Sequence, residues 1–238
     1  MSQRYIDFLA KLAIDNAHPG GHRLTESIIR QSKIQAGDRV LDVGCGTGAT
    51  AAFLTEEISA AVTAIDLHPK MVEHARQRAD HSETHFQVLN ASAEALPFKA
   101  DAFDWLISES VTAFTDPDKS LPEYYRVLSP EGQLIAIEMT IEHPLPEEDK
   151  KAICGLYGVP ALYTEQDWRD RLADAGFASI KCLREAELPE VQSKETGMPV
   201  YPLNAALDAD AIEVWLDHLN MMQTYKDVLT YRIYWAIK

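Results

Sequence analysis

Apolar positions along most of the chain follow one of two spacings, one typical of strands and the other of helices. The strand-like runs are rich in β-branched or other apolar residues and cover residues 39–43, 61–65, 85–89, 103–108 and 133–139. Helical spacing falls between them, over residues 49–58, 69–79 and 117–128. Nearly continuous apolar strands that alternate with helices predict an α/β fold, with a parallel sheet covered on both faces.

The ends of the chain follow this alternation less closely. Residues 2–15 and 25–31 predict two short helices, which the turn at 18–21 separates. The acidic, proline-rich residues 142–148 predict a surface loop. The elements expected after that loop are a helix capped by Thr164, a strand at 177–183, a long connection at 188–207, a helix opened by Asp208 or Asp210, and a strand within 229–238.

Composition and charge narrow the class of partner. The 238 residues include 22 Lys and Arg against 37 Asp and Glu, which gives a formal net charge of −15. Such a charge repels nucleic acid at long range, and no run approaches the ~20 apolar residues that a membrane span needs. Three cysteines without a CxxC pair indicate neither a disulfide framework nor a zinc site. We therefore expect a cytoplasmic protein without a signal peptide or metal, acting on small molecules.

The most informative motif is a glycine-rich turn, VLDVGCGTGATAAF, at residues 40–53. Gly44, Gly46 and Gly48 follow a predicted strand and open a predicted helix, whose free N–H groups favour an electron-rich ligand group. The stretch also matches the G-x-G-x-x-A spacing of dinucleotide-binding enzymes. Asp42 favours a different ligand, because a carboxylate repels a pyrophosphate but accepts hydrogen bonds from ammonium and hydroxyl groups.

A second carboxylate, Asp66, stands at the end of the second predicted strand, in AVTAIDLHP (61–69). A carboxylate in this place can accept hydrogen bonds from both hydroxyls of a ribose. The alternative is a structural one, in which Asp66 caps the helix that begins near Pro69.

Four motifs in order carry a resemblance to a known family. They are VLDVGCGTG, AIDLHPKMVEHAR, ASAEALPFKADAFD (91–104) and LPEYYRVLSPEGQL (121–134). The chain resembles the class I S-adenosylmethionine-dependent methyltransferases, and among them the small-molecule branch akin to the ubiquinone and menaquinone C-methyltransferases. The resemblance covers residues 35–140 and continues more loosely to the last strand. It implies a doubly wound, Rossmann-like sheet of seven mostly parallel strands, with the last strand antiparallel and a helical cap.

The resemblance also implies how the cofactor S-adenosyl-L-methionine, and its product S-adenosyl-L-homocysteine, are held. The glycines cradle the methionine part, Asp66 binds the ribose hydroxyls, and Leu67 and Met71 border the adenine. At Ser92 many members have an acidic residue, so here a serine hydroxyl takes the place of a carboxylate near the adenine amine. The full set of expected cofactor contacts is Asp42, Gly44, Cys45, Gly46, Gly48, Asp66, Leu67, Met71, Ser92, Ala93 and Ser108.

One methyltransferase domain over residues 1–238 is expected. Residues 1–32 form an N-terminal helical cap, 33–140 the cofactor-binding core, and 141–238 the C-terminal half of the sheet, with a cap insertion at 188–225. That insertion carries Met and aromatic residues that either line an apolar acceptor pocket or simply pack on the sheet.

Methyl transfer from a sulfonium is an in-line displacement that needs a positioned acceptor, and a base only where the acceptor must lose a proton. Loops after the fourth and fifth strands face the methyl group in such a sheet, which makes Glu109 and Glu138 the catalytic candidates. Each could instead cap a helix or lie in solvent. His18 lies at a turn before the core, where it lines the pocket entrance or only joins two helices.

Two other functions compete with methyl transfer to a small molecule. One is a nicotinamide-dependent oxidoreductase on a similar sheet, which Gly48 and the LPF…FD pattern at residues 96–104 disfavour. The other is a non-catalytic nucleoside-binding module, which the intact glycines and Asp66 disfavour. The sequence leaves the methylated atom open among carbon, nitrogen, oxygen and sulfur, and the oligomeric state open as well.

Overall fold

The computed structural model describes residues 4–82, 85–188 and 208–238. The strands are β1 (Arg39–Val43), β2 (Ala61–Asp66), β3 (Gln87–Asn90), β4 (Phe103–Glu109), β5 (Leu128–Ile141), β6 (Ala178–Leu183) and β7 (Leu229–Ile237). The helices are α1 (Arg4–Leu12), α2 (Gly21–Gln31), α3 (Ala49–Ile58), α4 (Pro69–His81), α5 (Pro117–Val127), α6 (Glu147–Tyr157), α7 (Glu165–Asp174) and α8 (Ala209–Thr224), with 3-10 turns η1 (Thr112–Phe114) and η2 (Glu185–Glu187).

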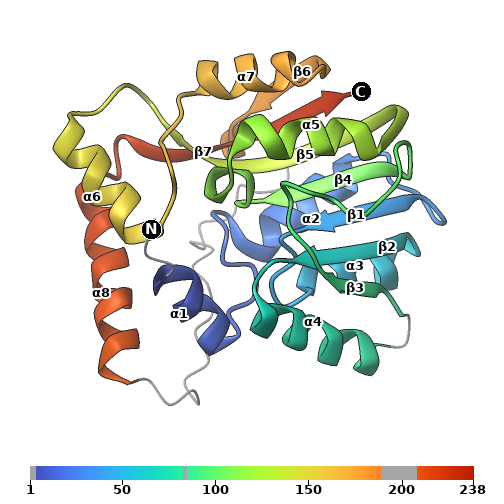
Figure 1. Ribbon diagram of the computed structural model, residues 1–238, viewed down its shortest axis with the longest axis horizontal. Coiled ribbons are helices and arrows are strands. Elements are labelled where there is room, and N and C mark those ends of the chain that lie inside the picture. Colours follow the sequence, from blue (N-terminus) through green and yellow to red (C-terminus); the bar gives the residue numbers. More distant parts are fainter. Residues whose placement is uncertain (1–3, 83–84, 189–207) are drawn as a thin grey trace.

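All seven strands join one sheet, in the order β3-β2-β1-β4-β5-β7-β6 (Figure 1). The pairs from β3 to β5 are parallel, and β7 runs antiparallel to both β5 and β6. The expected seven-stranded, mostly parallel sheet with an antiparallel last strand is therefore confirmed. Because β1 pairs with both β2 and β4, the direction of winding reverses between β1 and β4, where such sheets bind their ligands.

Two apolar clusters cover the two faces of the sheet, as the doubly apolar strands predict. In β1, for example, Val40 packs into one cluster and Leu41 into the other. Helices α2 and α3 and most of the apolar face of α4 cover one side. On the other side lie α5 and α7, together with α1, α6 and α8, which gather beyond the end of the sheet (Figure 1).

Within the described residues the predicted helices and strands are present with shifted bounds, together with one α-helix that the sequence does not predict. Helix α6 begins at Glu147, inside the stretch that the sequence predicts to be a surface loop. Pro146 is its N-cap, and Glu147, Glu148 and Asp149 fill its first turn, where negative charge stabilises a helix. The predicted capping of α7 by Thr164 is confirmed by reciprocal hydrogen bonds with Asp167.

Two further points concern the C-terminal half. The predicted connection at 188–207 lies almost wholly outside the described residues, while α8 begins after the N-cap Asp208, one of the two residues expected to open it. No helix in the described ranges combines the length and the apolar character that crossing a membrane requires.

Candidate functional site

The glycine-rich loop between β1 and α3 lies at the switch point of the sheet. Gly44 and Gly46 both have left-handed backbones, with φ of 66° and 54°. A Cβ atom on Gly44 would lie 2.2 Å from a methyl carbon of Val111, which follows β4, so the two loops touch here. A Cβ on Gly46 would meet no atom of the described residues within 4 Å, so this part of the chain leaves that side of the loop open.

Asp66 ends β2 beside this loop. Its carboxylate oxygens accept hydrogen bonds from the backbone N–H groups of Gly46, at 2.9 Å, and of His68, at 2.7 Å. His68, and not Asp66, is the N-cap of α4, so the structural alternative for Asp66 does not hold. Burial raises the pKa of Asp66, and the two N–H donors partly oppose that rise. Each oxygen keeps capacity for a further donor such as a ribose hydroxyl.

Asn90, at the end of β3, is a residue that sequence reasoning missed. Its side-chain amide donates to the backbone carbonyls of both Asp66 and Leu67, at 2.9 Å each, and so fixes the turn that carries them. The signal was available, because Asn90 stands at a strand end beside Asp66, but the predicted strand was stopped at Leu89.

Asp42 is the most unusual acid of the site. Its side chain is buried in β1, and among the described residues its Oδ2 atom has no hydrogen-bond partner. Burial raises its pKa well above the usual value, and the nearby carboxylates of Glu109 and Asp66 add to that rise. Three acids thus converge on the glycine loop, a combination that favours a positively charged ligand.

Glu109 ends β4, as predicted, but its carboxylate is already bonded. It accepts hydrogen bonds from the hydroxyls of Thr25 on α2, at 2.5 Å, and Thr50 on α3, at 2.6 Å. Its side chain is 11% exposed, and the ring nitrogen Nε2 of His18 lies 3.5 Å away. No local pattern predicts that Thr25 and Thr50 meet this carboxylate, because the three residues are far apart in the chain.

Glu138 does not end its strand, contrary to the prediction, because β5 continues to Ile141. Its buried carboxylate accepts from the backbone N–H groups of Thr112 and Ala113, at 3.1 and 3.0 Å, and from the Ser108 hydroxyl at 3.3 Å. Burial raises its pKa to about 7, against the opposing effect of these donors. Glu138 therefore anchors the loop after β4, of which Val111 touches Gly44.

The other expected cofactor contacts surround the same edge of the sheet. Met71 and Ala93 are buried, whereas Leu67 is 63% exposed. The Ser92 hydroxyl accepts from the backbone N–H of Glu94 at 3.1 Å. Burial raises the pKa of the Cys45 thiol, which keeps it in the neutral form.

The N-terminal helix α1 lies over this edge, beside α4 (Figure 1). Phe8 of α1 belongs to the same apolar cluster as Met71 and Ala93, the residues expected near the adenine. Two polar contacts add to the packing, from His68 to Asp7 and from the His74 ring to the Ala10 carbonyl, each at 3.2 Å. Helix α1, part of the predicted cap, therefore covers the edge of the sheet at which Met71 and Ala93 lie.

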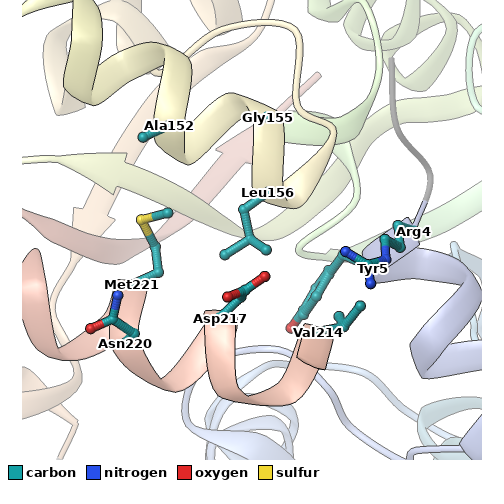
Figure 2. A pocket seen from close by; sticks show the side chains of 9 residues that line it. All are labelled: Arg4, Tyr5, Ala152, Gly155, Leu156, Val214, Asp217, Asn220 and Met221. Carbon is teal, nitrogen blue, oxygen red and sulfur yellow. The ribbon is translucent and has the colours of Figure 1, made fainter. Parts of the chain in front are cut away.

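A cavity of about 330 Å³ lies among α1, α6 and α8, away from the glycine loop (Figure 2). Tyr5, Leu156, Val214 and Met221 give it apolar walls, and Asp217 adds a carboxylate. Its lining includes Met221, one of the residues predicted for an apolar pocket wall, but none of the expected cofactor contacts. A second cavity, of about 490 Å³, lies on the outer side of the glycine loop, against α4.

Solved structures with the same arrangement define the class of fold. Phosphoethanolamine N-methyltransferase 2 of Haemonchus contortus, in complex with S-adenosyl-L-methionine, aligns with a TM-score of 0.75 and 22% identity over 99% of this chain and 56% of that chain. The [4+2]-cyclase SpnF aligns with a TM-score of 0.75 and 20% identity, over 99% of this chain and 93% of that one. The fold is the Rossmann-like methyltransferase fold.

Sequence comparison identifies the family. The model of the methyltransferase domain matches residues 40–132. The uncharacterized methyltransferase YodH of Bacillus subtilis is 32% identical over 235 residues, which cover 99% of each chain. The O-methyltransferase cnsE of Penicillium expansum is 33% identical over 190 residues, 76% of this chain and 68% of the relative. The chain belongs to the class I S-adenosylmethionine-dependent methyltransferases, and its cofactor is S-adenosylmethionine.

Proposed function

We propose that this protein transfers a methyl group from S-adenosylmethionine to a small-molecule acceptor in the cytoplasm, as a single domain with the boundaries given above. The buried Oδ2 of Asp42, which has no hydrogen-bond partner among the described residues, carries the proposal, because Asp42 lies near Asp66 and Glu109 beside a loop that these residues leave open at Gly46. S-adenosylmethionine has a sulfonium and an ammonium against one carboxylate, so its net positive charge fits three converging acids. A dinucleotide, with its negative pyrophosphate, does not fit them.

When bound, S-adenosylmethionine supplies an electrophilic methyl group on a sulfonium sulfur. The side chains of this protein then bind the cofactor and orient it toward the acceptor. Asp66 accepts the ribose hydroxyls, the glycine loop admits the methionine part, and Leu67 with Met71 borders the adenine. The α1 cap excludes water from the edge of the sheet. Proximity and alignment of the acceptor supply most of the rate enhancement in such a displacement.

The acceptor-facing groups are proposed to be Glu109 and, behind it, Glu138. One carboxylate oxygen of Glu109, Oε2, accepts only from Thr50 among the described residues and has capacity for an acceptor N–H or O–H. Glu138 acts on the acceptor indirectly, since both of its oxygens bind the loop after β4. The names of the relatives include O-methyltransferases and a demethylmenaquinone methyltransferase, which supports small-molecule acceptors as a class.

A ligand panel separates this proposal from its two rivals. S-adenosylmethionine and S-adenosylhomocysteine should raise the thermal unfolding temperature of the protein by mass action, while NAD should not. A screen of metabolite extracts with methyl-labelled S-adenosylmethionine, followed by mass spectrometry, then finds the acceptor. Cofactor binding without any labelled product would support the non-catalytic module, and stabilisation by NAD alone would support the oxidoreductase.

A further inference from the structure

A buried polar cluster joins the N-terminal cap to the carboxyl end of β4. It consists of His18, before α2, together with Thr25 on α2, Glu109 at the end of β4 and Thr50 on α3. The His18 side chain is only 4% exposed and the Thr25 residue 1%. Of these four residues, only Glu109 is among the groups to which the proposed function assigns a role.

The contacts of His18 form a short chain that ends on Glu109. Its Nδ1 atom lies 3.0 Å from the Pro19 carbonyl oxygen, and its Nε2 atom 3.1 Å from the Thr25 hydroxyl. The Thr25 hydroxyl in turn lies 2.5 Å from Oε1 of Glu109. The Thr50 hydroxyl donates to the other carboxylate oxygen at 2.6 Å.

Counting protons in this chain fixes its charge. A carbonyl oxygen can only accept, so Nδ1 of His18 carries a proton. Thr25 has a single hydroxyl proton, which cannot serve both Nε2 and Oε1. If the Thr25 proton goes to an ionised Glu109, then Nε2 must carry a second proton and His18 is an imidazolium. If it goes to Nε2, then Glu109 must be protonated. In both cases His18 and Glu109 together have zero net charge.

The surroundings favour the arrangement with two opposite charges. Thr50 lies in the first turn of α3, so Glu109 is close to a helix N-terminus and receives a hydroxyl donor there, and both features stabilise a carboxylate. Asp42 is another acid near this carboxylate. An imidazolium beside Glu109 offsets the negative charge of these acids.

We propose that His18, acting through Thr25, is a positioning residue that holds Glu109 as one half of a neutral ion pair. The catalytic meaning of the pair rests on the proposed function. Because the transition state of methyl transfer loses cationic charge, an unpaired carboxylate near the sulfonium would favour the reactant state. Pairing with His18 reduces that penalty, and it fixes the carboxylate oxygen that is to meet the acceptor.

Nitrogen NMR of the full-length, ligand-free protein with ¹⁵N-labelled histidine tests the pair directly, since imidazolium and neutral imidazole nitrogens have different chemical shifts. The signals of His18 are assigned by their loss in His18→Gln, with the exposed His143→Gln as the matched control. At neutral pH the wild type should show both nitrogens of His18 protonated. Glu109→Gln should convert His18 to the neutral form, because the buried cation then has no anion.

Variants at Thr25 distinguish the role of its hydroxyl, which lies between His18 and Glu109, from a role in packing. Thr25→Ser keeps a hydroxyl and should keep the imidazolium signature, whereas Thr25→Val should lose it while near-ultraviolet circular dichroism remains native. A neutral His18 in the wild type, or an imidazolium unchanged in Glu109→Gln, would overturn the proposal. Calorimetry with S-adenosylhomocysteine on the same samples tests the proposed function separately, because the NMR result does not depend on cofactor binding.

Discussion

The two halves of the site use their carboxylates in different ways. At the end formed by β1 and β2, Asp66 is held by backbone N–H groups of its own turn and of the glycine loop, and Oδ2 of Asp42 has no partner within residues 4–82, 85–188 and 208–238. At the end formed by β4 and β5, Glu109 and Glu138 are bonded by groups from other parts of the chain. The first pair leaves oxygen atoms that can accept further hydrogen bonds, whereas the second pair joins α2 and α3 to β4 and holds the loop after β4 in place.

This difference shows where local sequence is sufficient to assign a role. The cofactor end is assembled from two short motifs that each contain their own backbone donors. The proposed acceptor end is assembled only when α2, α3 and η1 pack around the end of β4 and around Glu138 inside β5. Substitutions at the cofactor end should therefore lower affinity directly, and substitutions at the acceptor end should first change the order of the surrounding loops.

The largest effect is expected from Gly44→Ala. The new Cβ adds left-handed strain of about 1–2 kcal/mol and overlaps Val111, so affinity for S-adenosylhomocysteine should fall about 100-fold or more by calorimetry. Adding Val111→Ala should recover part of that loss, because it removes the overlapping methyl groups. The control is Gly37→Ala, which has the same kind of positive φ, at 86°, and whose new Cβ has no atom within 4 Å in the part of the chain that the structure describes. Wild-type affinity in Gly44→Ala would contradict the close contact between the two loops.

Asp66→Ala should have the next largest effect on cofactor affinity. Losing charge-assisted hydrogen bonds to the ribose is expected to cost about 1.5–3 kcal/mol, which lowers affinity ten-fold or more. The fold should survive, since Asp66 lies at a strand end. Asp80→Ala, at an exposed acid on the neighbouring helix, controls for the loss of one negative charge. Equal affinities of the two variants would remove Asp66 from the site.

Glu138→Gln tests the role of this buried carboxylate through the pH dependence of protein stability. Folding raises the pKa of Glu138 from its usual 4.5 to about 7, so the folded state binds the extra proton between these values. The contribution of this group to stability therefore falls as pH rises from 4.5 to 7, by about 3 kcal/mol in all. Chemical denaturation at pH 5 and pH 8 should show that this decline is absent in the variant. An identical pH dependence in both proteins would show that Glu138 does not titrate in this range.

The smallest effect is expected at Asp104, an acid of β4 outside the site. It forms a partly exposed ion pair with Arg39, at 2.6 Å, and Arg39 lowers its pKa. Asp104→Asn should cost at most about 1 kcal/mol of stability and leave cofactor affinity unchanged. A loss of affinity in this variant would show that charge outside the two clusters also attracts the cofactor.

The sequence predicts the cofactor end and the fold more fully than the acceptor end. The bounds of β1 and α3 follow from the apolar run before Gly44 and the helix that the glycines open. The position of Glu138 was misjudged because β5 is lengthened by pairing with β7, a contact between residues about 90 apart. The bonds of Glu109 depend in the same way on Thr25, which no local pattern places beside it. Helix α6 was missed because its acidic first turn follows prolines that also indicate a loop.

Calorimetric titration of the wild-type protein and of Asp66→Ala with S-adenosylhomocysteine tests whether the glycine loop and Asp66 form the cofactor site. We expect binding at one site per chain in the wild type, at least ten-fold weaker binding in the variant, and no heat with NAD. Absence of binding in the folded wild type, or equal affinity in the two proteins, would contradict a cofactor site built on the glycine loop and Asp66.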